Sequence, residues 1–279
     1  MPNSKLKNLA ILILLLANLC LLAVILPIHM EQQREAENSR QSISRLYEKE
    51  QLQLDPAIIP ETEMLYALQL SSDGDGDYRA VTALLGEQVL AEDSSTRYLS
   101  TYQSRYGQCT LSRSGGFEAV LSEGQSIPDI RSDSRKILRA MGFQPYYLGE
   151  PSRVDDGTYV VQASQAVLGV PIFSQGLQLV YEDGRLAQIS GTFYTGTNNL
   201  TRVSEDACLS AVDALVRFLS VRLELGWVGS TILSMEQGYL RTETAAAATV
   251  HLVPVWRIST DTGSFYINGL TGDVSSISG

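Results

Sequence analysis

An uninterrupted apolar run near the N-terminus constrains this chain more than any other feature. Residues 9–28 contain no charged side chain, and Asn18 is their only strongly polar one. A helix needs about 20 apolar residues to cross about 30 Å of hydrocarbon, at a rise of about 1.5 Å per residue. The run therefore predicts a transmembrane anchor.

A cleaved signal peptide is the competing interpretation, because lysines precede the run. A signal peptide has an apolar stretch of about 7 to 15 residues followed by small residues at a cleavage site. This run is longer and ends in Leu26-Pro27-Ile28. Cys20 follows Leu19 in the middle of the run, which is not where a lipid-acceptor cysteine is found. We expect an uncleaved anchor in contact with the lipid bilayer.

Charge predicts the orientation of this anchor and the class of partner. Lys5, Lys7 and the α-amino group lie on one side of the run, while lysine beyond it occurs only at positions 49 and 136. We expect single-pass cell-membrane localisation with a cytoplasmic N-terminus and an extracytoplasmic bulk. The chain carries a formal charge of −10. Such a surface repels nucleic-acid phosphates, so no nucleic-acid partner is expected.

The predicted fold class is α+β, with a transmembrane helix and stalk followed by three repeated units, each a helix on an antiparallel sheet. Residues 31–54 are polar, helix-favouring and free of Gly and Pro, which is typical of a solvated helical stalk. The expected divisions are a cytoplasmic tail (1–8), the anchor (9–28), the stalk (29–60) and three units (61–128, 129–200 and 201–279).

Periodicity and turn residues locate the elements of these units. We expect a first helix from about Tyr78 to Ala91, a second from about Ser132 to a left-handed stop at Gly142, and a third capped by Ser204. Asp183-Gly184 predicts a hairpin turn. The expected strands cover residues 98–106, 108–113, 117–121, 158–167, 170–181, 185–195, 231–242, 249–260, 264–268 and 274–277.

The inventory of reactive side chains argues against an enzyme. His29 and His251 are the only histidines, too few for a multi-histidine metal site, and neither accompanies a triad. Lys136 lies in a polar helical run, where a solvated charge is the simpler interpretation than Ser-Lys catalysis. The acids of residues 71–77 lack the glycine and twelfth-position acid of a calcium loop, and indicate a solvated loop instead. No catalytic, metal or cofactor residue is predicted.

Two cysteines lie beyond the apolar run. Cys208 falls on the apolar stripe of the third predicted helix, and Cys109 falls in a predicted strand of the first unit. Two cysteines in so long a segment do not make a disulfide framework. We expect two buried, unpaired thiols, with a Cys109–Cys208 disulfide as the open alternative.

Five segments in this order resemble the YycH/YycI regulatory-protein family of Gram-positive bacteria, most closely its YycI-like branch. They read KLKNLAILILLLANLCLLAVIL, LQLDPAIIPE, GVPIFSQGLQLVYEDGRLAQISGTFY, SEDACLSAVDALVRFL and LVPVWRISTDTGSFYINGLTGDVSSI. The last strand-rich pieces also resemble PepSY-type (PepSY/cystatin-like) units, in which a helix packs on an antiparallel sheet. The order of the segments carries the resemblance, because each one alone is only moderately specific.

The resemblance implies a non-enzymatic, membrane-anchored extracytoplasmic regulator. Its partner would be the membrane sensor histidine kinase of a two-component system that controls cell-wall metabolism, together with a paralogous regulator. PepSY-like units also occur in proteins that inhibit or escort secreted peptidases and cell-wall hydrolases, so a binding module of that kind is the alternative. The family has no catalytic residues to carry over to this chain.

One stripe of the apolar helix is a candidate contact for a partner helix. At heptad spacing, small and branched residues share a face, and Asn18 lies beside it where it could add an interhelical hydrogen bond. A stripe without functional meaning is the alternative, and the slightly favoured one. The residues concerned are Ala10, Ile13, Ala17, Asn18, Cys20 and Val24.

Overall fold

The computed structural model describes residues 3–71, 73–92, 99–122, 127–173, 176–197, 199–242 and 249–276. Within the first helix, the side chains described are those of residues 7, 11–23, 27, 30, 31 and 33–49. The helices are α1 (Asn3–Lys49), the 3-10 helix η1 (Pro56–Ile58), α2 (Gly74–Leu85), α3 (Ile130–Met141) and α4 (Ala211–Val221).

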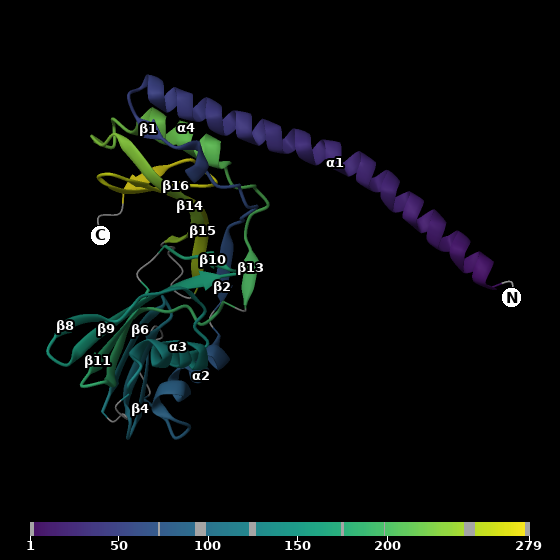
Figure 1. Cartoon of the computed structure of the whole chain (residues 1–279). Coiled ribbons are helices and arrows are strands. Elements are labelled where there is room, and N and C mark those ends of the chain that lie inside the picture. Colours follow the sequence, from purple (N-terminus) through teal and green to yellow (C-terminus); the bar gives the residue numbers. More distant parts are fainter. Residues whose placement is uncertain are drawn as a thin grey trace.

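Beyond α1 the chain is mostly sheet, arranged in two large sheets (Figure 1). The seven-stranded sheet contains β1 (Gln53–Leu54), β2 (Leu68–Ser71), β13 (Leu200–Arg202), β14 (Thr231–Thr242), β15 (Thr249–Thr260), β16 (Gly263–Asn268) and β17 (Val274–Ser276). The ten-stranded sheet contains β3 (Leu90–Glu92), β4 (Leu99–Ser104), β5 (Gly107–Ser112), β6 (Gly116–Leu121), β7 (Pro145–Leu148), β8 (Ser152–Asp155), β9 (Thr158–Val167), β10 (Val170–Pro171), β11 (Leu177–Glu182) and β12 (Arg185–Thr192).

The first helix corrects the prediction of a membrane anchor. Among the residues that the structure describes, no helix has the length and apolar character needed to cross a bilayer. The predicted anchor over residues 9–28, and with it the single-pass membrane localisation, is therefore wrong.

The end of α1 is part of the protein core, not a solvated stalk. The helix runs without interruption from the apolar run to Lys49, with Pro27 inside it. Ile43 and Tyr47 are buried, and the Tyr47 hydroxyl donates a hydrogen bond of 2.9 Å to the carbonyl oxygen of Leu215 on α4. After the helix, β1 adds to the seven-stranded sheet as a parallel neighbour of β14.

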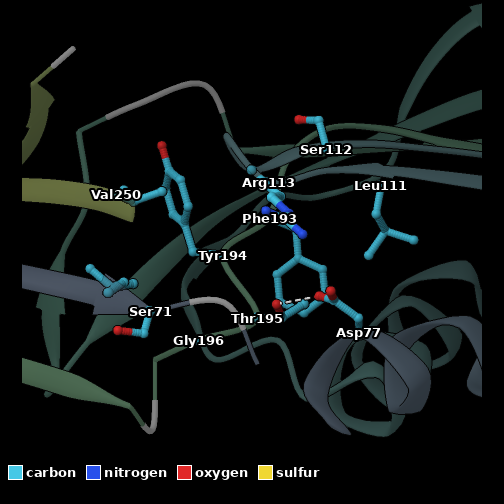
Figure 2. Close-up of a pocket in the computed structure, with 12 residues that line it drawn as sticks. Ser71, Asp77, Leu111, Ser112, Arg113, Phe193, Tyr194, Thr195, Gly196 and Val250 are labelled. Atoms are coloured by element: carbon cyan, nitrogen blue, oxygen red, sulfur yellow. Dashed lines mark hydrogen bonds between the residues drawn. The ribbon is translucent and has the colours of Figure 1, made fainter. Parts of the chain in front are cut away.

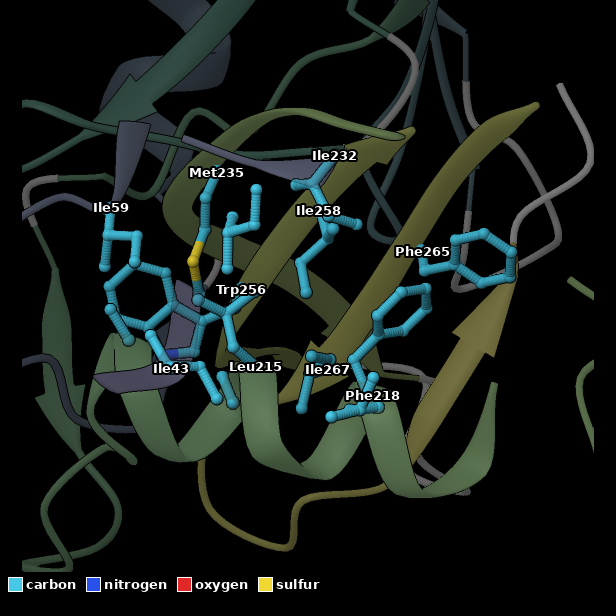
Figure 3. Close-up of a cluster of buried hydrophobic side chains, with 14 of the residues drawn as sticks. Ile43, Ile59, Leu215, Phe218, Ile232, Met235, Trp256, Ile258, Phe265 and Ile267 are labelled. Carbon is cyan, nitrogen blue, oxygen red and sulfur yellow. The ribbon is translucent and has the colours of Figure 1, made fainter. Parts of the chain in front are cut away.

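The seven-stranded sheet is covered on one face by α4, and Figure 3 shows the core between them. Leu215 and Phe218 of α4 point toward Trp256 and Ile267 of the sheet. The rings of Phe218 and Phe265 lie 5.0 Å apart between centroids. Burial of this apolar stripe stabilises α4, since a short helix is marginal on its own.

The ten-stranded sheet overturns the prediction of three repeated units. The strands expected for the first unit and those expected for the second form one continuous sheet. They join where β6 pairs with β12, with Phe117 opposite Gly191. Helices α2 and α3 contribute to a single buried cluster with this sheet, including Val81, Leu138 and Leu179. The predicted fold class, an anchor and stalk followed by helix-plus-sheet repeats, is therefore wrong.

A third buried cluster joins the two sheets. Leu68 and Leu70 of β2 pack with Val167 at the end of β9 and with Tyr239 of β14. The N–H of Phe173 donates a hydrogen bond of 2.7 Å to the carbonyl oxygen of Tyr239. The two sheets are thus held together by apolar burial and by direct backbone contact.

Two of the predicted helix ends and turns are confirmed, and one is wrong. The left-handed stop of α3 at Gly142 is confirmed, with φ of 85°. Asp183-Gly184 is confirmed as the turn between β11 and β12, with positive φ at both residues. The helix expected from Ser204 begins instead at Ala211, where the hydroxyl of Ser210 accepts a hydrogen bond from the N–H of Asp213.

Cys109 and Cys208 are both buried and unpaired, which confirms the expectation for these thiols. Cys208 lies just before α4, not on its stripe. A side chain at Gly269 would overlap the Cys208 sulfur, so glycine is required there for this thiol to be buried. Burial raises the pKa of the Cys109 thiol to about 12, with a further contribution from the carboxylate of Asp77.

Candidate functional site

A large groove lies beside the folded body, between α1 and the start of α4, and is here called the α1–α4 groove. Its volume is about 800 Å³, within the range of about 300–1,000 Å³ that is typical of ligand sites. Three segments far apart in the sequence line it. The lining residues are Gln33, Ala36, Glu37, Ser39, Arg40, Ile59, Pro60, Glu61, Thr62, Ser210, Ala211, Val212 and Asp213.

The groove forms because the described contacts that fasten α1 to the body lie at its C-terminal end. Tyr47 bonds the Leu215 carbonyl, and the carboxylate of Glu50 forms an ion pair of 2.7 Å with Arg222. The buried hydroxyl of Ser44 donates to the Leu54 carbonyl oxygen at 2.6 Å. Toward its N-terminus the helix then leaves the body (Figure 1). The turns between residues 33 and 40 form one wall of the groove.

The groove has an apolar floor and an acidic rim. Ile59 and Ala211 are buried beneath it, and Ala36 presents only a methyl group on the α1 side. The carboxylate of Glu37 pairs with Arg40 at 3.9 Å, which leaves the exposed acids Glu61 and Asp213 as the net charge of the rim. An apolar floor with an acidic rim suits a ligand with an apolar face and basic flanks.

The N-terminus of α4 opens into this groove but is already capped. The Ser210 hydroxyl accepts from the N–H of Asp213 at 3.1 Å, and the Thr62 hydroxyl accepts from the N–H of Ala211 at 3.0 Å. The Asp213 carboxylate in turn accepts from the Ser210 hydroxyl at 2.6 Å. Because these donors are satisfied and a carboxylate lies beside them, the helix end does not provide an anion site.

A second, smaller hollow lies where α2 meets the loop after β12, and Figure 2 shows its side chains. The Thr195 hydroxyl donates a hydrogen bond of 2.5 Å to the carboxylate of Asp77. Burial raises the pKa of Asp77, while the Thr195 bond and the nearby Arg113 oppose that rise. The hollow measures about 30 Å³, which is room for one or two waters. It is a polar joint within the fold and too small for an organic ligand.

The predicted contact stripe on α1 lies on one helix, away from the folded body. Ile13, Ala17 and Cys20 are exposed, whereas the side chains of Ala10 and Val24 fall outside the described residues. The Asn18 side-chain amide donates a hydrogen bond of 2.9 Å to the Leu14 carbonyl of its own helix. Contact of this stripe with a partner helix stays a prediction.

The remaining candidates from the sequence are spread through the fold. His251 lies in β15 of the seven-stranded sheet, whereas Lys136 lies on α3, which packs with the ten-stranded sheet. Of the residues 71–77 expected to form a solvated loop, 74–77 instead begin α2, with Asp75 and Asp77 in its first turn, so the expectation is wrong for this part. Among the described residues, histidine, cysteine and acidic side chains nowhere cluster in threes as a metal site requires.

Sequence reasoning missed both hollows. The start of α4 carried a usable signal, because Ser210 followed three residues later by Asp213 has the spacing of a helix cap. The pairing of Asp77 with Thr195 had none, since 118 residues separate them. Only the tertiary fold brings the walls of the α1–α4 groove together.

The sequence comparisons identify no family for this chain. No family model matches the chain. A search of curated proteins also finds no match.

Proposed function

We propose that this protein is a non-catalytic regulator that acts by binding another protein in the α1–α4 groove. The partner we propose is a sensor histidine kinase of a two-component system that controls cell-wall metabolism. The main support for the proposal is the α1–α4 groove. It has an apolar floor and an acidic rim, and it lies between the long helix α1 and the capped start of α4.

The shape and charge of the groove favour a helical ligand. Amphipathic helices bind by laying an apolar face into a hydrophobic groove, with anchors at about one-turn intervals. Ala36 keeps the α1 wall low, and Ile59 and Ala211 form the apolar floor. Glu61 and Asp213 complement basic residues on either side of such a face. The proposed ligand is therefore an amphipathic, basic helix of the kinase.

The choice of a kinase comes from the sequence. Five segments in order resemble the YycI-like regulators, and two of them contribute to the groove: LQLDPAIIPE supplies Ile59, Pro60 and Glu61, and SEDACLSAVDALVRFL supplies Ser210 to Asp213. The alternative partner, a secreted peptidase or cell-wall hydrolase, follows from the PepSY-like resemblance of the strand-rich segments. The two partners make different predictions for the same experiment.

The test is photo-crosslinking from within the groove. A photoreactive amino acid replaces Ala36 in the full chain, and a matched variant carries it at the exposed Glu224, which does not line the groove. After irradiation of the cells of origin, mass spectrometry identifies the crosslinked peptides. Kinase peptides joined to residue 36 and not to residue 224 are the expected result. Hydrolase peptides at residue 36 would contradict the kinase, and equal labelling at both positions would contradict the groove.

A further inference from the structure

The face of the ten-stranded sheet that α2 and α3 leave uncovered carries a second recognition feature. Side chains alternate along each strand, so the neighbours of the buried Val161, Leu179 and Ile189 point to the opposite face. On that face Gln162 of β9, Gln178 of β11 and Ser190 of β12 form one cross-strand row, because Gln178 pairs with both of the others. Three hydrogen-bonding side chains thus stand side by side.

A depression of the sheet lies beside this row. Gly176, which precedes β11, lines it, and a side chain there would overlap the carbonyl oxygen of Ala163, so glycine lets these two segments approach closely. The depression, here called the sheet hollow, has a volume of about 530 Å³, which is enough for a ligand of several rings. Its lining residues are Tyr147, Gln162, Ala163, Ser164, Gly176, Leu177, Gln178, Ser190 and Gly191.

An exposed aromatic ring forms one wall of the sheet hollow. Tyr147 lies on β7 opposite Ser164, at a register shift between β7 and β9. A register shift of this kind changes the direction in which a side chain points. The Tyr147 side chain remains 59% exposed, and Gly149 lies close beside its ring and hydroxyl. Burying an exposed ring against a ligand is favourable, and the hydroxyl can still bond.

The chemistry of the sheet hollow selects an uncharged ligand. All of its described lining residues are uncharged, although the chain has a net charge of −10. Amide and hydroxyl groups both donate and accept hydrogen bonds. Glu118 of the adjacent β6 pairs with Ser190, outside the lining of the hollow, and its carboxylate can accept from hydroxyl groups. Anions are repelled by the surrounding charge. A peptide that adds a strand would need an open sheet edge, whereas this hollow lies on a face.

From this geometry we propose that the sheet hollow binds a neutral oligosaccharide. One sugar ring packs its apolar face on Tyr147, while Gln162, Gln178 and Ser190 exchange hydrogen bonds with its hydroxyl groups. No residue lines both this site and the α1–α4 groove, so the proposal does not depend on the proposed function.

The test is titration of the full chain with three neutral tetrasaccharides, namely cellotetraose, maltotetraose and tetra-N-acetylchitotetraose, and with the anionic tetragalacturonate. Isothermal calorimetry should find a Kd below about 1 mM for at least one neutral sugar. Tyr147→Ala and Gln178→Ala should each weaken binding about ten-fold or more. Tyr146→Ala is the matched control, because Tyr146 is also exposed but does not line the hollow, and its hydroxyl instead donates to Glu236 at 2.5 Å.

Three outcomes would overturn this assignment. The first is that no neutral tetrasaccharide binds. The second is that Gln178→Ala, a surface change that leaves the core intact, binds as tightly as the unchanged chain. The third is that tetragalacturonate binds as well as the neutral sugars, since the uncharged lining would then have no selective role.

Discussion

Replacing Tyr47 by alanine tests whether the end of α1 belongs to the core. The Tyr47 side chain is fully buried against α4, and its hydroxyl bonds the Leu215 carbonyl. A buried aromatic side chain removes about 150–250 Å² from water. At about 25 cal/mol per Å² this gives about 4–6 kcal/mol, which is an upper bound because unfolded chains bury some surface. Comparable aromatic truncations cost about 3–5 kcal/mol.

We therefore expect Tyr47→Ala to lower the free energy of unfolding by about 4 kcal/mol. Tyr47→Phe keeps the ring and removes only the hydrogen bond, so it should cost about 1 kcal/mol. Leu46→Ala is the control, because the neighbouring Leu46 is 39% exposed, and it should cost less than about 1 kcal/mol.

Urea unfolding followed by tryptophan fluorescence measures these differences. Both tryptophans of the chain, Trp227 and Trp256, belong to the same buried cluster as Tyr47, so their emission reports on this core. If Tyr47→Ala shifted the unfolding midpoint no further than Leu46→Ala does, the end of α1 would not be part of the core.

Three further predictions follow from buried groups. Burial raises the pKa of Asp77, so loss of its proton destabilises the folded state increasingly as pH rises from about 3.8 through the raised pKa. Relative to the unchanged chain, Asp77→Asn should therefore gain stability between pH 4 and 7, as measured by urea unfolding. Cys109 and Cys208 should resist iodoacetamide in the native protein and react after denaturation, and a peptide joining them by a disulfide in mass spectrometry would contradict this. Gly238→Ala should destabilise by several kcal/mol, because the methyl group would overlap the Phe173 ring, whereas Gly74→Ala, in open space, should change the thermal midpoint by only about 1–2 °C.

Turn and cap chemistry could be predicted from the sequence where the signal was local and complete. Gly142 and Asp183-Gly184 need only their own backbone conformation, and both predictions hold. Ser204 misled because its hydroxyl does accept from the N–H of Asp206, which is the pattern of a polar turn. The helix cap lies six residues later, at Ser210.

Strand neighbours and the packing of α1 could not be predicted from local patterns. Alternation shows which face of a strand is apolar but not which strand lies beside it, so the pairing of β6 with β12 stayed hidden and the repeats looked separate. The polar second half of α1 carries only a few apolar groups, yet Ile43 and Tyr47 are enough to fix its end in the core. The α1–α4 groove results from that contact, so no sequence motif predicts it.

A charge reversal on the rim of the α1–α4 groove tests whether the kinase binds there. Glu61 lines the α1–α4 groove, and Glu224 is an exposed acid that does not. Quantitative co-purification from the cells of origin compares the kinase recovered with the unchanged chain, Glu61→Lys and Glu224→Lys. We expect Glu61→Lys to lower recovery about ten-fold, since a like charge against a basic helix costs on the order of 1–2 kcal/mol, and Glu224→Lys to leave it unchanged. Equal kinase recovery with all three proteins would contradict binding in this groove.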